Sequence, residues 1–183
     1  MRGIMILSNY FEDTEALTTL DVLRRANLEV DTVSVVDGKM ITTQSKVVIY
    51  SDKHISEIDY TDYDFLIVPG GKAVSQTLDK LEIVDDIITH FVTSNKLTSF
   101  ICAAPHLPGK LGFLKDKSYT CFPGCNDEIV GGTYQKEKSL VVDGNIITCR
   151  SMAYSIDFAL EIIDNLLGKN QKEKVKRSIQ GLE

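Results

Sequence analysis

Short apolar runs alternate with longer amphipathic segments along most of the chain. A continuous apolar run is typical of a strand buried on both faces of a sheet, whereas apolar residues at every third or fourth position are typical of a helix. The runs predict strands at Gly3–Leu7, Val30–Val36, Phe65–Val68 and Leu97–Ile101. The helical spacing predicts helices at Phe11–Ala26, Leu81–Phe91 and Ile156–Leu167, with a shorter helix around His106–Leu114.

Local signals mark several boundaries between these elements. Acidic residues in the first turn of the first helix, and Arg24 and Arg25 in its last turn, match the helix dipole. The segment Met40–Tyr50 is typical of one or two short strands. The turn Asp143-Gly144-Asn145 predicts a hairpin between two short strands, and Gly168 predicts the end of the helix that precedes it.

Alternating strands and helices predict an α/β fold with a mostly parallel sheet and helices on both faces. A length of 183 residues favours one domain, residues 1–183, which buries roughly 70% of its unfolded surface. In such sheets, ligands bind beyond the carboxyl ends of the strands. The search for a functional site therefore starts at the residues that follow each strand.

Composition and charge exclude several classes of function. A net charge of −6 argues against a nucleic-acid partner, because phosphates call for a basic face. A basic cluster at 169–177 is interpreted as the solvated face of a final helix. No apolar run approaches the roughly 20 residues of a membrane span, and no targeting segment is evident at the start of the sequence. Four cysteines without an export signal predict a cytoplasmic protein with free thiols.

Three candidate features follow predicted strands. These are Glu12 and Glu15 after the first strand, the pair Gly70-Gly71 after a later one, and Cys102 after another. The residues Ala103-Ala104-Pro105 suit the first turn of a helix, which would place the Cys102 thiol near the positive end of a helix dipole and favour the thiolate. The convergence of these three strand-end features at one edge of the sheet is the main argument for an active site.

Each feature also has an ordinary interpretation. Most buried cysteines are inert small apolar residues, and an acid such as Glu15 is common at the solvent-facing start of a helix. Glu12 is interpreted as a surface acid that favours the dipole, or as a residue that supports the site. A glycine pair after a strand is often a plain turn.

Read together, several stretches resemble the ThiJ/PfpI superfamily, closest to its DJ-one-like branch, which is named for the Parkinson-disease protein deglycase. Any one stretch is a weak signal, but the ordered set is specific and extends over nearly the whole chain. The matching stretches are Phe11–Ala16, Asp21–Ala26, Val68–Gly71, Ile101–Pro105 and Asp157–Leu160.

This resemblance implies a flavodoxin-like three-layer sandwich that forms a homodimer. It implies that Cys102 is a nucleophile on a strained elbow and that Glu15 supplies the carboxyl beside it. The backbone N–H groups of Gly71 and Ala103 would then line an oxyanion site. Members of this branch are associated with glyoxalase III-type conversion of 2-oxoaldehydes, with a disputed deglycase activity, and with stress or chaperone roles.

The chemistry can also be argued from the residues. A thiolate adds readily to the aldehyde of methylglyoxal and forms a hemithioacetal. A carboxyl with a raised pKa can move protons between the adjacent carbons, and hydrolysis then releases lactate. Glu15 close to a thiolate should prefer its protonated form, because two like charges share a site only at high cost. We therefore expect a cysteine-dependent enzyme, a hydro-lyase or hydrolase, that needs no metal or cofactor.

Histidine is scarce near Cys102. His106 lies four residues later and could share a helix side with it, but the protease-like branch carries histidine directly after the cysteine, where this chain has Ala103. We therefore interpret His106 as a packing or helix-surface residue, and His54 and His90 as surface residues without partners. The deglycase branch often has a histidine before the proline that is Pro123 here.

Phe122 occupies that position in this chain, so a polar contact to substrate or sulfur is absent from it. Cys121 and Cys125 make a poor zinc site, because no second pair or suitably placed histidine accompanies them. Cys121 could resolve an oxidised Cys102, although a partly buried thiol is the more ordinary interpretation. Cys149 is expected to pack at the end of the last hairpin strand.

Two other functions stay open. The first is a redox-responsive stress protein or chaperone in which Cys102 is oxidised to sulfinic acid, because the same reactive thiol suits both roles. The second is hydrolase or amidotransferase-like acyl chemistry, which would need a histidine base beside Cys102. If the protein is the cysteine-dependent enzyme, its expected partner is a small reactive carbonyl compound, which is the substrate.

Overall fold

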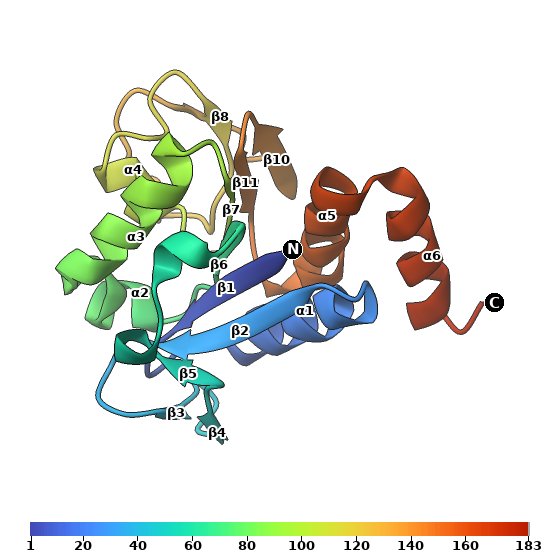
Figure 1. The fold of residues 1–183 in the computed structure, drawn as a ribbon. Helices are drawn as coiled ribbons and strands as arrows, with labels where there is room; N and C mark the ends of the chain where they lie inside the picture. Colours follow the sequence, from blue (N-terminus) through green and yellow to red (C-terminus); the bar gives the residue numbers. More distant parts are fainter. Residues whose placement is uncertain (183) are drawn as a thin grey trace.

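A seven-stranded sheet forms the centre of the molecule in the computed structural model, which describes residues 1–182 (Figure 1). The strand order is β10-β11-β7-β6-β1-β2-β5, and every neighbouring pair is parallel except β10 and β11. The strands are β1 (Arg2–Leu7), β2 (Glu29–Ser34), β5 (Lys53–His54), β6 (Phe65–Val68), β7 (Leu97–Ile101), β10 (Leu140–Asp143) and β11 (Ile146–Cys149).

Helices cover both faces of this sheet, which confirms the predicted α/β architecture. On one face, α1 (Asp13–Arg25) and α5 (Ser155–Leu167) pack side by side, and on the other α3 (Glu82–Thr93) packs on β6 and β7 (Figure 1). The helix α6 (Lys169–Ile179) packs against α5 at the edge of the molecule. Shorter helices are α2 (Ala73–Gln76), α4 (His106–Lys110) and the 3-10 turns η1 (Ile55–Glu57), η2 (Tyr60–Asp62), η3 (Leu78–Lys80) and η4 (Met152–Tyr154).

The central strands β1 and β6 contribute fully buried side chains to the hydrophobic core. The side chains of β1 from Ile4 to Leu7, and those of Phe65–Val68 in β6, are fully buried. Their continuous apolar pattern therefore reports burial on both faces, as predicted. No helix among residues 1–182 combines the length and the apolar character that a membrane span requires.

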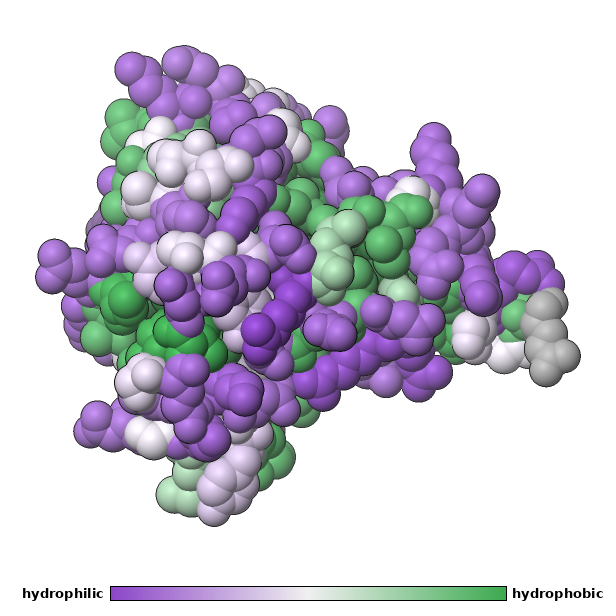
Figure 2. All heavy atoms as spheres, viewed as in Figure 1, coloured by the Kyte–Doolittle hydropathy of each residue, from purple (hydrophilic) through white to green (hydrophobic). Residues whose placement is uncertain are grey.

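Two small sheets lie outside the main one. The strands β3 (Met40–Thr42) and β4 (Val48–Tyr50) form an antiparallel hairpin, and β8 (Ser118–Tyr119) pairs in parallel with β9 (Thr133–Tyr134). The hairpin β3–β4 exposes Met40, Val48 and Tyr50. Figure 2 shows apolar surface at the lower end of the molecule, where Figure 1 places this hairpin.

The helix ends follow the chemistry of their residues. The Glu12 side chain caps α1 by accepting a hydrogen bond from the backbone N–H of Glu15 at 2.7 Å. Phe11, predicted as the start of this helix, instead forms an isolated bridge with Gly71. Gly168 ends α5 with a φ of 84°, as predicted.

In α6, the side chain of Lys172 is only partly exposed and pairs with Glu161 and Asp164, so this basic helix is not solvated throughout.

The helix predicted around His106–Leu114 begins at His106 but is shorter than expected, and the helical turn expected at Ala103–Pro105 is absent. Residues 102–105 form consecutive turns, and α4 covers only His106–Lys110. Gly112, with a φ of 80°, ends the helical path soon afterwards. Cys102 is therefore not the first residue of a continuous helix, and the backbone N–H groups around it belong to turns.

Candidate active site

The three features predicted at strand ends converge on one cavity. Cys102 follows β7 and Gly71 follows β6, while Glu15 lies in the helix after β1, and these three strands are neighbours in the sheet. The cavity has a volume of about 390 Å³. Its lining comprises Glu12, Glu15, Gln44, Gly71, Lys72, Ser75, Cys102, Ala103, Phe122, Ser151 and Met152.

The backbone at Cys102 adopts a conformation that is unusual for a residue with a side chain. Its φ is +63°, in the left-handed region. The N–H of Cys102 donates to the carbonyl of Cys149 at 2.9 Å, and its own carbonyl accepts from the N–H of Phe122 at 2.8 Å. These two bonds hold the turn and aim the side chain into the cavity.

Backbone donors surround the sulfur. The backbone N–H groups of Gly71 and Ala103 lie near enough to the Cys102 thiol to lower its pKa. Gly71 has a φ of +89°, and a Cβ built there would lie 2.5 Å from the backbone nitrogen of Glu12. A Cβ at Gly70 would lie 2.7 Å from the Cβ of Cys102. The glycine pair is therefore more than a plain turn, because only glycine lets β6 approach both reactive residues.

Glu15 is a buried acid, not the solvent-facing residue of the ordinary interpretation. Its exposed fraction is 1%. Oε2 accepts a hydrogen bond from the N–H of Gly70 at 2.9 Å, and the N–H of Met152 also reaches the carboxyl. The other carboxyl oxygen, Oε1, is buried and has no hydrogen-bond partner among residues 1–182.

Burial raises the pKa of Glu15 to about 7, although hydrogen bonds from Cys102 and Gly70 lower it. The nearby Glu12 carboxylate raises it further. A substantial share of Glu15 is therefore protonated near neutral pH, as the sequence argument expected. A buried, partly protonated carboxyl is suited to giving and taking protons.

The ionisation of the Cys102 thiol differs from the sequence-based prediction that a helix dipole favours the thiolate. Burial raises the pKa of Cys102, and an ionised Glu15 raises it further, whereas the N–H groups of Gly71 and Ala103 lower it. The prediction of a thiolate favoured by a helix dipole was therefore wrong in its cause. Burial and an ionised Glu15 therefore favour the neutral thiol, and the titrations of the two side chains are linked, because the charge on Glu15 changes the pKa of Cys102.

Several lining residues were not predicted. Ser151 and Met152 lie two and three residues after the end of β11, whose carboxyl end lies beside that of β7. The predicted hairpin alone did not reveal that its second strand joins the parallel sheet, so this signal was missed. Gln44 and Lys72 come from loops, where the N–H of Lys72 donates to the Gln44 side chain at 2.9 Å. Nothing in their sequence context pointed to the site.

No histidine lines this cavity among residues 1–182. His106 Nε2 lies 3.3 Å from Asp79 and 3.7 Å from Glu128, in a neighbouring cavity of about 300 Å³. This agrees with a packing role and not with a base for Cys102. His54 and His90, expected to lack partners, contact the Val36 carbonyl and the ring of Tyr60, respectively.

The other three cysteines are free thiols. Cys121 and Cys149 are buried, and burial raises the pKa of each to about 12. Cys125 is partly buried and lines the cavity next to His106. Within residues 1–182, no group of three or more His, Cys, Asp or Glu side chains is placed to hold a metal ion.

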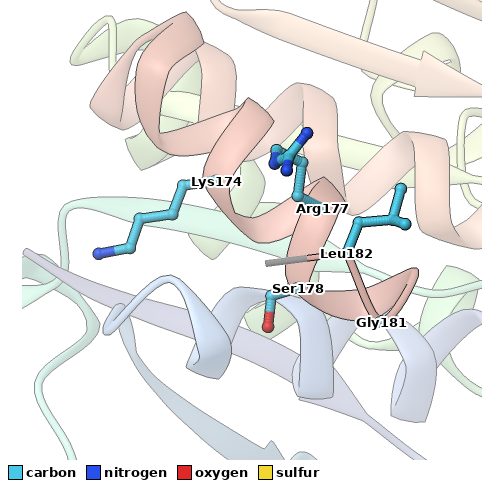
Figure 3. A pocket seen from close by; sticks show the side chains of 5 residues that line it. All are labelled: Lys174, Arg177, Ser178, Gly181 and Leu182. Carbon is cyan, nitrogen blue, oxygen red and sulfur yellow. The ribbon is translucent and has the colours of Figure 1, made fainter.

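A larger hollow of about 580 Å³ lies at the C-terminal helix (Figure 3). Its lining residues, Lys174, Arg177, Ser178, Gly181 and Leu182, all come from α6 and the turn after it. Figure 3 shows the labelled side chains pointing in different directions along one helix. The Cys102 cavity differs because groups from several elements converge there on a thiol and a buried acid, so it is the stronger candidate.

Comparison with known sequences supports the family expected from the motifs. The model of the DJ-1/PfpI family matches residues 1–165. Protein dj-1beta of Drosophila melanogaster is 31% identical over 181 residues, covering 98% of this chain and 95% of the relative. The Parkinson disease protein 7 homolog of Danio rerio is 28% identical and covers 96% of this chain and 94% of the relative.

Solved structures of DJ-1 proteins resemble this fold, in agreement with the sequence relatives. The crystal structure of Drosophila melanogaster DJ-1beta has a TM-score of 0.92 at 29% identity, covering 98% of this chain and 97% of that one. Oxidized Toxoplasma gondii DJ-1 has a TM-score of 0.91 at 25% identity, with coverage of 98% and 97%. These likenesses confirm the flavodoxin-like fold. The extent of the matches shows that the chain belongs to the DJ-1/PfpI family.

Proposed function

We propose that the protein is a cysteine-dependent, glyoxalase III-type or deglycase-like enzyme that acts on small 2-oxoaldehydes. The DJ-1/PfpI family includes glyoxalase, deglycase and stress-response members. The observation that carries the proposal is the coupled pair of Cys102 and Glu15, with backbone N–H groups from two strand ends around the sulfur. Catalytic roles for Cys102 and Glu15, and an oxyanion role for the N–H groups of Gly71 and Ala103, are part of this proposal.

The reaction begins when Glu15 holds the proton and the Cys102 sulfur is ionised. The sulfur adds to the aldehyde carbon of methylglyoxal, and the carbonyl π electrons move to the oxygen. The N–H groups of Gly71 and Ala103, which already surround the sulfur, are placed to stabilise this oxyanion. Glu15 then donates its proton to the oxygen, and a neutral hemithioacetal results.

The second stage moves hydrogen between two carbons. The Glu15 carboxylate removes the proton from the carbon bonded to sulfur and passes it to the neighbouring carbonyl oxygen, so that a neutral enediol forms. Glu15, again a carboxylate, then takes the proton from the hydroxyl on the carbon bonded to sulfur. Return of a proton to the adjacent carbon gives a thioester of lactate, in which the first carbon is oxidised and the second is reduced. Water hydrolyses the thioester, releases lactate and restores the thiol, so no external oxidant or reductant is consumed.

Lactate formation from methylglyoxal by the purified protein tests this proposal. We expect Cys102→Ser to abolish it and Glu15→Gln to reduce it by about a hundredfold or more, within the range typical of a lost acid–base group. Cys125→Ser is the matched control, because this thiol lies outside the cavity of Cys102 and should be dispensable. Unchanged turnover in Cys102→Ser would refute the mechanism.

A second candidate is a redox-responsive stress protein or chaperone. Its support is that Cys102 reaches an open cavity, whereas Cys121 and Cys149 are buried. A related structure, that of Toxoplasma gondii DJ-1, was solved in an oxidized form. Selective addition of two oxygens to Cys102 by mild peroxide, in a protein that makes no lactate, would favour this function over the enzyme.

We also propose that the chain acts as a single domain, forms a homodimer and works in the cytoplasm. DJ-1 family proteins commonly form homodimers. The exposed apolar side chains of the hairpin β3–β4 suit a contact with a second copy. Analytical ultracentrifugation of the wild type and of Tyr50→Asp measures whether this surface contributes.

A further inference from the structure

Two large apolar side chains border the reactive thiol and remain about half exposed. Phe122 is 48% exposed and Met152 is 49% exposed, and both line the cavity of Cys102. A ligand that covers them removes apolar surface from water, which favours binding. An aromatic group is especially suited, because it can stack against Phe122 and contact the thioether of Met152.

The positions of these two residues are tied to the reacting groups. The N–H of Phe122 donates to the carbonyl of Cys102 at 2.8 Å. The N–H of Met152 reaches the Glu15 carboxyl, and the Ser155 hydroxyl donates to the carbonyl of Met152 at 2.8 Å. Both side chains therefore start from backbone that is held in place relative to the sulfur and the acid.

The cavity is larger than a three-carbon substrate needs. Methylglyoxal has about the volume of four water molecules, roughly 120 Å³ when each occupies about 30 Å³. The cavity measures about 390 Å³. The remaining space is large enough for a substituent the size of a phenyl ring on the carbon next to the aldehyde, and its lining includes Phe122 and Met152.

Opposite charges line the cavity, on Glu12 and Lys72, so they offer no net attraction to a charged substituent. The Glu12 carboxylate is hydrogen-bonded to the backbone N–H of Glu15 and so lies close to the reacting pair. The Lys72 side chain is exposed to water at the rim. An anionic substituent would meet the Glu12 carboxylate near the reaction centre, whereas an uncharged ring would not.

We infer that the substrate class of this site is 2-oxoaldehydes that carry an aromatic or similarly bulky apolar substituent, which Phe122 and Met152 contact. This inference rests on the proposed function, since it assigns the specificity of the same site. Phe122 stands where the DJ-one-like branch often has a histidine, so the substitution exchanges a polar contact for an apolar one.

The experiment compares phenylglyoxal with methylglyoxal as substrates. In the wild type, kcat/KM for phenylglyoxal should exceed that for methylglyoxal by about tenfold or more, mainly through a lower KM. Phe122→Ala and Met152→Ala should each remove most of this preference, because each lowers kcat/KM for phenylglyoxal more than kcat/KM for methylglyoxal. Phe122→Tyr, which keeps an aromatic ring at this position, should retain the preference for phenylglyoxal. Val142→Ala is the control, because it shortens an exposed apolar side chain on β10 outside the cavity.

A second readout does not depend on turnover. Each aldehyde is tested for protection of Cys102 from iodoacetamide, with the peptide that contains Cys102 quantified by mass spectrometry after short incubation. Phenylglyoxal should protect at a concentration about tenfold lower than methylglyoxal, and Phe122→Ala should abolish that difference. Equal protection by both aldehydes overturns the inference. Selective protection without hydroxy-acid formation refutes the proposed enzyme function but supports the apolar site.

Discussion

Burial of Glu15 should make the folded state less stable as the pH rises. Its pKa is about 7 in the folded protein, against an ordinary value of 4.5. Below pH 4.5 the carboxyl is protonated in both the folded and the unfolded state, so it imposes no ionisation cost. Between these two pH values the unfolded chain releases the proton while the folded protein keeps it. Stability therefore falls with rising pH and levels off above about pH 7.

The size of the effect follows from the same two values. Each pKa unit corresponds to about 1.4 kcal/mol, so the difference between 4.5 and about 7 gives roughly 3 kcal/mol. Little screening by solvent is expected, because Glu15 is only 1% exposed. Glu15→Gln cannot ionise and keeps a side-chain oxygen that can accept from the N–H of Gly70. The variant should therefore gain roughly 3 kcal/mol relative to the wild type between pH 4.5 and pH 7.5.

Urea denaturation at a fixed protein concentration measures this difference. Circular dichroism is the suitable probe, since the chain has no tryptophan. The free energy of unfolding is determined at several pH values from 4.5 to 8 for the wild type, for Glu15→Gln and for Glu173→Gln. Glu173 is an exposed residue of α6, so its variant should run parallel to the wild type. Parallel curves for Glu15→Gln and the wild type would refute the argument that this acid is buried at a cost.

Two further changes test the packing around the site and a salt bridge remote from it. Gly70→Ala should destabilise the protein by about 1–3 kcal/mol and slow alkylation of Cys102, because the new Cβ would lie 2.7 Å from the Cβ of Cys102 and 2.8 Å from Glu15 Oε2. Gly38→Ala, where a Cβ meets nothing within 4 Å but the φ is +73°, is the comparison, because it has a backbone cost of about 1 kcal/mol and should leave alkylation of Cys102 unchanged. Equal slowing of alkylation in both variants would contradict the role of close approach. Burial tends to raise the pKa of Asp52, but hydrogen bonds from Thr32 and the charge of Arg24 outweigh it and lower that pKa below 3.8. Asp52→Asn should therefore cost about 1 kcal/mol at pH 7, a modest value because the Asp52 side chain is 43% exposed, and the cost should vanish as the pH falls below 3.8 through the folded pKa. A cost that persists at low pH in urea titrations would show that the carboxylate charge is not its origin.

Much of the fold could be predicted from local pattern. The apolar runs of β1 and β6, the spacing of α1, α3 and α5, and the turn between β10 and β11 each depend on neighbours in sequence, and all of these elements are present. The candidate site was also predictable in outline. Parallel strands end at one edge of the sheet, so residues after β1, β6 and β7 meet there whatever the details of packing.

Other features depended on contacts between distant segments. Whether Glu15 faces water or the cavity is decided by the turn after β6, where Gly70 lies 55 positions away and donates to the Glu15 carboxyl. The helix expected directly after Cys102 gave way to turns, because hydrogen bonds to Cys149 and Phe122 hold this residue at a positive φ. Local propensity contains no information about such partners.

The sequence by itself thus determined the elements, their alternation and the residue types at the strand ends, because these follow from short-range periodicity and chain geometry. Only the tertiary structure decided that Glu15 is buried, that Glu15 and Cys102 lie close enough to shift each other's pKa, and that Met152 joins Phe122 in the lining of the cavity. Burial and electrostatic coupling arise between atoms that the fold brings together from far apart in the chain, so they are set by packing and not by local sequence.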